Sequence, residues 1–258
     1  MADQLQELRA RIFLRSCLPL IKVVAEDRPL YRKLLFKACG VVQFAAKDSE
    51  SGAWVELGDG TMAVKQGRHP DPSLTVVFKT LKDMNSFFAG GMVMFGVKGV
   101  KGLPSLVRLL PFLLKLKILL PTAMPKDPAE KALKVKLLLY MITNALSQLN
   151  KGGEETMVKI VKNSPDRIFQ FTVENGGPSA YLRMKGGRTK AGRGIYTRRR
   201  PYVHMIFPDI DGAFDVLTQT VGTVDGVRYG KVRTEGAMEG SKDIGILMQK
   251  VDALATGG

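Results

Sequence analysis

The chain repeats itself, and this repeat constrains its fold more than any other feature of the sequence. The segment Val41–Ala46 aligns with Ile168–Val173 at a shift of 127 residues. The match continues without a gap, so that Gly52–Leu57 falls on Ser179–Met184. Similarity of this kind within one chain indicates two tandem copies of one structural module.

The shift becomes 129 residues further along, where Leu74–Phe78 aligns with Val203–Phe207. Chance likeness between two amphipathic segments is the alternative, but the ungapped strand-turn-strand match argues against it. A length of 258 residues also fits two hydrophobic cores better than one. We therefore predict a first module at residues 1–122 and a second, more divergent module at residues 123–258, joined near the proline-rich segment Leu120–Lys126.

Each copy presents the same order of local signals. A helical region, Gln4–Cys39 in the first copy, is broken near Asp27–Pro29 because proline lacks the N–H that a helix interior needs. Four extended runs follow, at Val41–Lys47, Ala53–Leu57, Thr61–Gln66 and Ser73–Lys79. After them come a helix at Leu81–Ala89, another extended run at Met92–Lys98 and a last helix from Pro104. Short turns such as Gly58–Gly60 favour an antiparallel meander. The pattern predicts an α+β fold.

Several of these segments resemble the sterol carrier protein family, the intracellular nonspecific lipid-transfer module. In the first copy the resemblance is carried by Gly52–Leu57 leading to Asp59 and Gly60, by Asp71–Phe78, by Phe87–Gly91 and by Gly99. The second copy is a more divergent match from Ile168 to Leu254, and Arg200-Pro201 stands where Asp71-Pro72 stands in the first.

The resemblance implies two tandem modules, each a mostly antiparallel twisted sheet covered by helices around an apolar tunnel. Family members bind sterols, fatty acids or fatty acyl-CoA without catalytic residues or cofactors. We therefore expect non-catalytic binding or transfer of a hydrophobic small molecule. The alternative is an interaction or scaffold protein whose tunnels are filled by side chains and whose basic hairpin docks an acidic partner or a membrane surface.

Apolar side chains beyond what a small core needs are the candidates for ligand binding, because burying an alkyl chain is favourable. The last helix of the first copy suits lining a tunnel, meeting a membrane interface or packing between modules, whereas the last helix of the second copy is an ordinary amphipathic one. Ordinary core packing is the alternative for each candidate. The candidates are Phe87, Phe88, Met92, Met94, Phe95, Leu106, Leu109, Leu110 and Leu113.

The net charge of +15 points to an anionic partner. The stretch Arg183–Arg200 contains eight basic residues and no acidic one, and either contact with an anionic membrane or a solvated loop fits it. Within it, the candidates for an anionic surface are Arg193, Arg198, Arg199 and Arg200. Tyr196 and Tyr202 are too few for base stacking, so nucleic acid is not the expected partner.

Catalytic and metal-binding patterns are missing from the sequence. It has no GxSxG motif, and its two histidines, His69 and His204, are insufficient for a histidine-rich metal site. Cys17 and Cys39 lack metal-ligand spacing. These observations predict a cytoplasmic protein that is not an enzyme and holds no metal or cofactor. Charged residues and prolines interrupt the apolar run Leu103–Leu120, so a membrane span is not expected there.

Overall fold

The computed structural model describes residues 2–35, 38–58 and 60–256. The chain divides into two compact units, Met1–Leu120 with Leu254–Gly258 (the first unit) and Pro121–Ala253 (the second unit). Phe36 and Lys37 of the predicted helical region and Asp59 of the predicted turn lie outside the described residues.

The first unit begins with helices that follow the predicted break. They are α1 (Ala2–Ile12), a π-helical turn (Phe13–Cys17), α2 (Leu20–Asp27) and α3 (Pro29–Leu34). Arg28 has an extended backbone, with φ −123° and ψ 107°, because a residue before proline disfavours the helical conformation. Pro29 then starts α3, where its missing N–H costs nothing. The predicted interruption is confirmed.

The first sheet has the order β3-β2-β1-β4-β5. Its strands are β1 (Gly40–Ala46), β2 (Gly52–Gly58), β3 (Thr61–Gln66), β4 (Leu74–Phe78) and β5 (Gly96–Lys98). β1 pairs parallel with β4, and the other pairs are antiparallel. The expected meander therefore holds only for β1 to β3, because the chain crosses from one edge strand to the far side of β1 before β4 begins. The α+β class is confirmed, with a mixed sheet.

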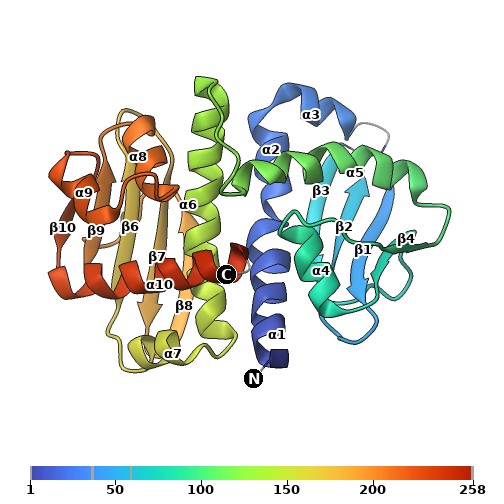
Figure 1. Ribbon diagram of the computed structural model, residues 1–258, viewed down its shortest axis with the longest axis horizontal. Helices are drawn as coiled ribbons and strands as arrows, with labels where there is room; N and C mark the ends of the chain where they lie inside the picture. Colours follow the sequence, from blue (N-terminus) through green and yellow to red (C-terminus); the bar gives the residue numbers. More distant parts are fainter. Residues whose placement is uncertain (1, 36–37, 59, 257–258) are drawn as a thin grey trace. The chain divides into compact units, whose positions relative to one another are not determined.

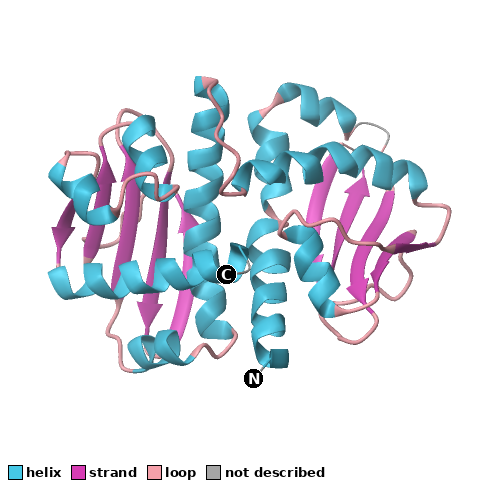
Figure 2. Cartoon of the chain, in the orientation of Figure 1, coloured by secondary structure: helices cyan, strands magenta, loops and turns pink. Residues whose placement is uncertain are grey.

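Helices α4 (Leu81–Phe88) and α5 (Leu103–Lys115) follow β4 and β5, and α5 ends in a 3-10 turn (Leu116–Leu119). Thr80 and Asp83 form a capping box that fixes the start of α4. The helices lie against one face of the sheet (Figures 1 and 2), where the ring of Phe88 contacts that of Phe44 at 5.7 Å between centroids. The core of the first unit forms between these layers.

The second unit repeats this plan with a longer first helix. Its elements are α6 (Pro128–Lys151), α7 (Glu155–Lys162), β6 (Arg167–Val173), β7 (Ser179–Lys185), β8 (Arg188–Arg193), β9 (Val203–Phe207), α8 (Ile210–Leu217), α9 (Thr223–Arg228), β10 (Arg233–Gly236) and α10 (Met238–Thr256). The sheet order is β10-β9-β6-β7-β8, with β6 parallel to β9. The short helix α9 lies between α8 and β10, where the first unit has no helix.

The strand register of the two sheets follows the shifts seen in the sequence. Gln43 lies opposite Trp54 and Thr75, and Gln170 lies opposite Tyr181 and His204. These partners differ by 127 and 129 residues, as the alignment requires. The two sheets therefore share one pairing scheme.

Glycines at the ends of the last strands are equivalent as well. Gly99 has φ +85° and Gly236 has φ +99°, both in the left-handed region that favours glycine. A Cβ at Gly99 would lie 2.7 Å from the carbonyl oxygen of Ser73, and one at Gly236 would lie 2.2 Å from that of Tyr202. Both units therefore need a glycine where the last strand ends, although the last helix begins at Leu103 in the first unit and at Met238 in the second.

Each sheet also buries a glutamine on its central strand. Gln43 Oε1 accepts a hydrogen bond from the backbone N–H of His69, and Gln170 Oε1 accepts one from the N–H of Tyr196. The His69 ring packs edge-on against Trp54 at 4.6 Å between centroids. Both glutamines thus hold the loop that carries the chain from the third strand to the fourth.

Candidate functional site

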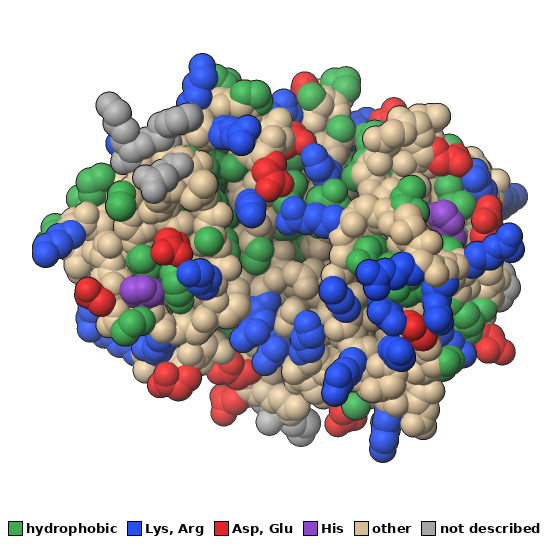
Figure 3. Space-filling view, turned by 180° about the vertical axis from the view of Figure 1, so that it is seen from behind, with side chains coloured by type: hydrophobic (Ala, Val, Ile, Leu, Met, Phe, Trp, Pro, Cys, Tyr) green, Lys and Arg blue, Asp and Glu red, His purple; other side chains and the backbone are tan. Residues whose placement is uncertain are grey.

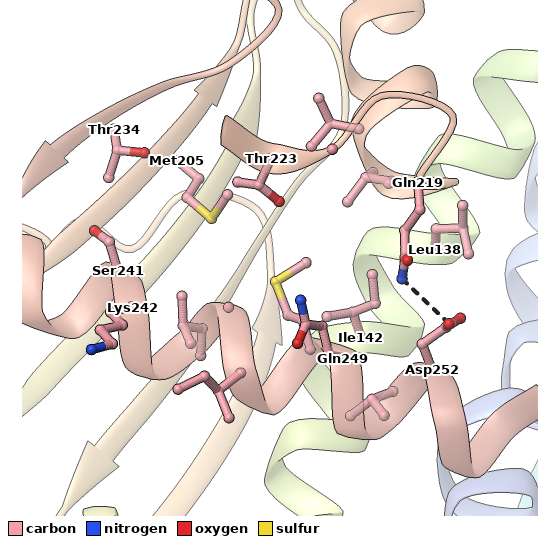
Figure 4. Close-up of a pocket in the computed structure, with 18 of the residues that line it drawn as sticks. Leu138, Ile142, Met205, Gln219, Thr223, Thr234, Ser241, Lys242, Gln249 and Asp252 are labelled. Atoms are coloured by element: carbon pink, nitrogen blue, oxygen red, sulfur yellow. Dashed lines mark hydrogen bonds between the residues drawn. The ribbon is translucent and has the colours of Figure 1, made fainter. Parts of the chain in front are cut away.

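A pocket of about 430 Å³ lies within the second unit. It is bounded by α6, α8 and α10, by strand β9 and by the segment around Thr223 (Figure 4). Among the α10 residues that line it, Ser241, Ile244, Gly245, Met248, Val251 and Asp252 recur at helical spacing, and Lys242, Ile246 and Gln249 lie beside them. This spacing puts them on one face of the helix, so α10 presents a continuous side to the pocket.

The pocket wall is mainly apolar. It includes Leu138, Met141 and Ile142 from α6, Met205 from β9 and Val216 from α8. Each of these side chains keeps between 5% and 8% of its surface exposed, whereas neighbouring core residues such as Leu137 and Leu139 keep at most 1%. Met141, Met205 and Met248 are unbranched and flexible, so this wall can adjust to ligands of different shapes.

Polar side chains lie at both ends of the pocket, and Thr223 and Gln249 lie between them (Figure 4). Thr234, Ser241 and Lys242 lie at one end, and Gln219 lies beside Asp252 at the other. Gln219 Nε2 donates a hydrogen bond to Asp252 Oδ2 at 3.3 Å. Desolvation by burial raises the pKa of Asp252, and the hydrogen bond from Gln219 opposes this rise. The arrangement fits a molecule with an apolar body and a polar end.

Gln219 has an unusual backbone conformation at this rim. Its φ of 59° is in the left-handed region, which residues other than glycine adopt rarely. Such local strain persists only where the surrounding structure enforces it, and it is common at binding sites. The backbone bond from Val221 N–H to the Asp215 carbonyl closes the same turn. Gln219 is therefore held in place at the pocket edge.

The candidate ligand residues of the first unit have dissimilar environments. Leu109 is fully buried, and Phe87 and Phe88 are half-buried in ring contacts with Phe78, Phe95, Phe13 and Phe44. Leu106 and Leu113 are also half-buried. Met92 and Met94 are almost fully exposed, and Phe95 and Leu110 are 46% exposed. Their role as one ligand site, and the tunnel expected there, stay predictions.

The basic candidates do not form one free patch. Arg193 lies over the ring of Tyr140 at 4.9 Å, and Arg199 Nη1 lies 3.5 Å from Asp166 Oδ2. Arg198 and Arg200 are exposed. Asp166 lies outside the basic stretch and also binds Arg183 through two hydrogen bonds of 2.7 and 2.6 Å. The hydrogen bonds from Arg183 lower the pKa of Asp166, which keeps a negative charge among these arginines.

Lys and Arg side chains outnumber Asp and Glu on the face of the molecule shown in Figure 3. This distribution agrees with the net charge of +15. Contact of Arg193, Arg198, Arg199 and Arg200 with an anionic surface stays a prediction.

The two cysteines differ in accessibility. Cys39 is exposed, whereas Cys17 is buried, and burial raises the pKa of the Cys17 thiol to about 12. Cys17 is therefore a protonated core residue at neutral pH. Among the described residues, no group of three or more His, Cys, Asp or Glu side chains is arranged to hold a metal ion.

None of the helices in the described part of the chain is both long enough and apolar enough to cross a membrane.

Sequence reasoning missed the pocket in the second unit. The pattern of α10 predicts an ordinary amphipathic helix, which by itself does not indicate a pocket. A usable signal was the methionines at 141, 205 and 248, which lie on three separate elements. Sequence alone does not reveal that these elements converge.

Comparisons with known proteins give limited similarity. No protein-family model matches the chain, and no curated protein matches it. The solution structure of palmitated SCP2L2 from Aedes aegypti is similar over 36% of this chain and 92% of its own, with 16% identity and a TM-score of 0.26. Part of this chain is thus similar to a sterol-carrier-protein-like structure. Two tandem copies of that family stay a prediction.

Two further similar structures belong to the sec-alkylsulfatase PisA1. A double mutant of this enzyme covers 58% of the chain at 12% identity and a TM-score of 0.33, and the Pisa1 chain from Pseudomonas sp. covers 53% at 12% identity and a TM-score of 0.26. The matched parts are only 22% and 26% of the sulfatase chains.

These sulfatase chains correct the expectation that the protein is not an enzyme. That expectation relied on missing motifs and on a family without catalytic residues. Missing sequence motifs do not exclude catalysis, because one fold can carry unrelated functions.

Proposed function

We propose that the chain binds a lipid or another hydrophobic small molecule in the pocket of its second unit. The observation that carries the proposal is the pocket itself, which has about 430 Å³ of space and a mainly apolar wall that also carries several polar groups. Small-molecule sites typically have volumes of about 300–1,000 Å³ and this kind of lining. A solved structure of palmitated SCP2L2 is partially similar to this chain, but the proposal does not rest on that similarity.

Gly245 offers a direct way to test the pocket. It lines the pocket on α10, and a Cβ added there would meet no heavy atom within 4 Å. We expect Gly245→Phe to place its ring in the open space and to abolish binding of a fluorescent fatty acid. Gly245→Ala is the matched control, because it also removes the glycine and favours the helix at least as much as phenylalanine does, without filling the pocket.

Two measurements report on ligand binding. Mass spectrometry of natively purified protein should detect a co-purified lipid in the wild type and in Gly245→Ala, and none in Gly245→Phe. Saturating ligand at about 100 times its Kd should stabilise the first two by about 2.7 kcal/mol in thermal unfolding and leave Gly245→Phe unchanged. A folded wild type that carries no lipid and binds no fluorescent fatty acid would favour the scaffold alternative.

A further inference from the structure

Helix α5 in the first unit exposes an apolar stripe. Leu103, Val107, Leu110 and Leu114 are between 46% and 61% exposed and recur at helical spacing. Ser105, Leu109 and Phe112 are the buried residues of the same helix. A helix that packs against a core with one face normally shows polar residues on the other. The outer side of α5 departs from this pattern.

The segment that leads into α5 is equally apolar and even more exposed. Met92 and Met94 are 103% and 94% exposed, and Val100 is 83% exposed. Between them runs β5, the edge strand of the sheet, in which every residue is exposed. The segment and α5 follow each other directly along the chain (Figure 1). Large exposed apolar surfaces of this kind mark interaction sites.

All formal charges in this part of the chain are positive. Residues 84–126 contain no Asp or Glu, and their basic residues are Lys98, Lys101, Arg108, Lys115, Lys117 and Lys126. Lys98 and Lys101 are exposed and lie between the methionines and α5. A second copy of this chain would bring like charges together at this surface, whereas an anionic bilayer combines negative headgroups with an apolar interior.

We propose that Met92, Met94, Val100 and the α5 stripe dock the first unit on an anionic membrane surface. The apolar side chains enter the boundary between headgroups and acyl chains, while Lys98 and Lys101 stay at the level of the headgroups. Interfacial helices with basic flanks bind membranes in this way without crossing them. This proposal does not depend on the pocket, so we expect Gly245→Phe to dock like the wild type.

Vesicle co-sedimentation tests the apolar contribution. Mixed phosphatidylcholine–phosphatidylserine vesicles should bind the triple variant Met92→Ser, Met94→Ser, Val100→Ser about tenfold or more weaker than the wild type. The matched control is Leu30→Ser, Val224→Ser, Val227→Ser, which removes residues that are 76%, 83% and 52% exposed elsewhere. Its affinity should stay within about twofold. An equal loss in both triple variants would overturn the proposal.

A pair of charge variants tests the lysines. Lys98→Gln with Lys101→Gln should weaken binding to the anionic vesicles about tenfold and lose this effect in high salt. Arg198→Gln with Arg200→Gln should have little effect; a larger loss there would place the docking surface in the second unit instead. Light scattering tests whether this surface instead binds a second copy of the chain. If the wild type is a dimer and the Met92, Met94 and Val100 triple variant is a monomer, the surface is a dimer interface and the proposal is wrong.

Discussion

At the scale of single residues, the buried glutamines explain how a sequence repeat becomes a structural one. The alignment could pair Gln43 with Gln170, because both occupy the centre of a β-branched and aromatic run. It could not predict which groups the two side chains hydrogen-bond. Their hydrogen-bond partners, His69 and Tyr196, lie in loops without periodic signals, and side-chain bonds to a distant backbone leave no local pattern.

We expect Gln170→Leu to destabilise the protein by about 1–3 kcal/mol. Gln170 is 1% exposed, and its Nε2 also donates to the carbonyl oxygens of Ala180 and Gly194, at 3.1 and 3.2 Å. Leucine has a similar size but leaves these groups without their partner. Urea unfolding measures the loss, and Gln4→Leu at an exposed position should change stability by less than about 0.5 kcal/mol. Equal midpoints for the two variants would show that the glutamine network contributes nothing.

At the scale of elements, sequence patterns predict the positions of strands and helices better than they predict which strands pair. The third strand was predicted at Thr61–Gln66 and found there. The run predicted at Met92–Lys98 forms a strand only at Gly96–Lys98. In the antiparallel register with β4, which ends at Phe78, residues 92–94 lie beyond the end of that strand. Propensity describes the local chain, whereas pairing depends on distant segments.

The same limit applies to the candidate site. The apolar composition of α5 suggested a ligand helix, but its stripe faces outward, while α10 lines a pocket with fewer apolar residues. Composition gives the amount of apolar surface, and the packing of neighbouring elements decides where it faces.

A salt bridge between Lys250 and Glu154 links helix α10 to the start of α7. Lys250 Nζ donates to Glu154 Oε1, and Glu154 also caps α7 by accepting from the backbone N–H of Met157. Burial by itself would raise the pKa of Glu154, but the hydrogen bonds from Lys250, Met157 and Thr156 lower it overall. This contact therefore stabilises the folded state in its ionised form.

The lowered pKa fixes the pH dependence of this contact. Its stabilisation is complete above the ordinary glutamate pKa of 4.5 and is lost as the pH falls from there through the lower pKa of the folded state. We expect Glu154→Gln to cost about 1–3 kcal/mol at pH 7 and progressively less at acidic pH, measured by urea unfolding across the range. A difference between variant and wild type that does not vary with pH would contradict the ionic contribution.

At the scale of the whole molecule, each sheet is complete within its own unit. No strand pair joins the two sheets among the described residues, and the connection between Leu120 and Pro128 contains three prolines counting Pro128. The prolines of this segment predict a boundary between two modules there. We propose that the units are two modules that fold separately.

We expect residues 121–258 to fold when produced alone, because they contain a complete sheet, its covering helices and the pocket. Circular dichroism should show a cooperative thermal transition, and the fragment should bind the same fluorescent fatty acid as the full chain. A fragment with secondary structure but no cooperative transition would show that the first unit is needed for its packing.

The placement of Trp54 has an optical consequence. It is the one tryptophan in the chain, and it lies on β2 of the first unit, whereas its equivalent in the second unit is Tyr181. Tryptophan emission therefore reports on one half of the molecule alone, and circular dichroism reports on both. Comparing the two signals during denaturation would reveal the order in which the halves unfold without any added label.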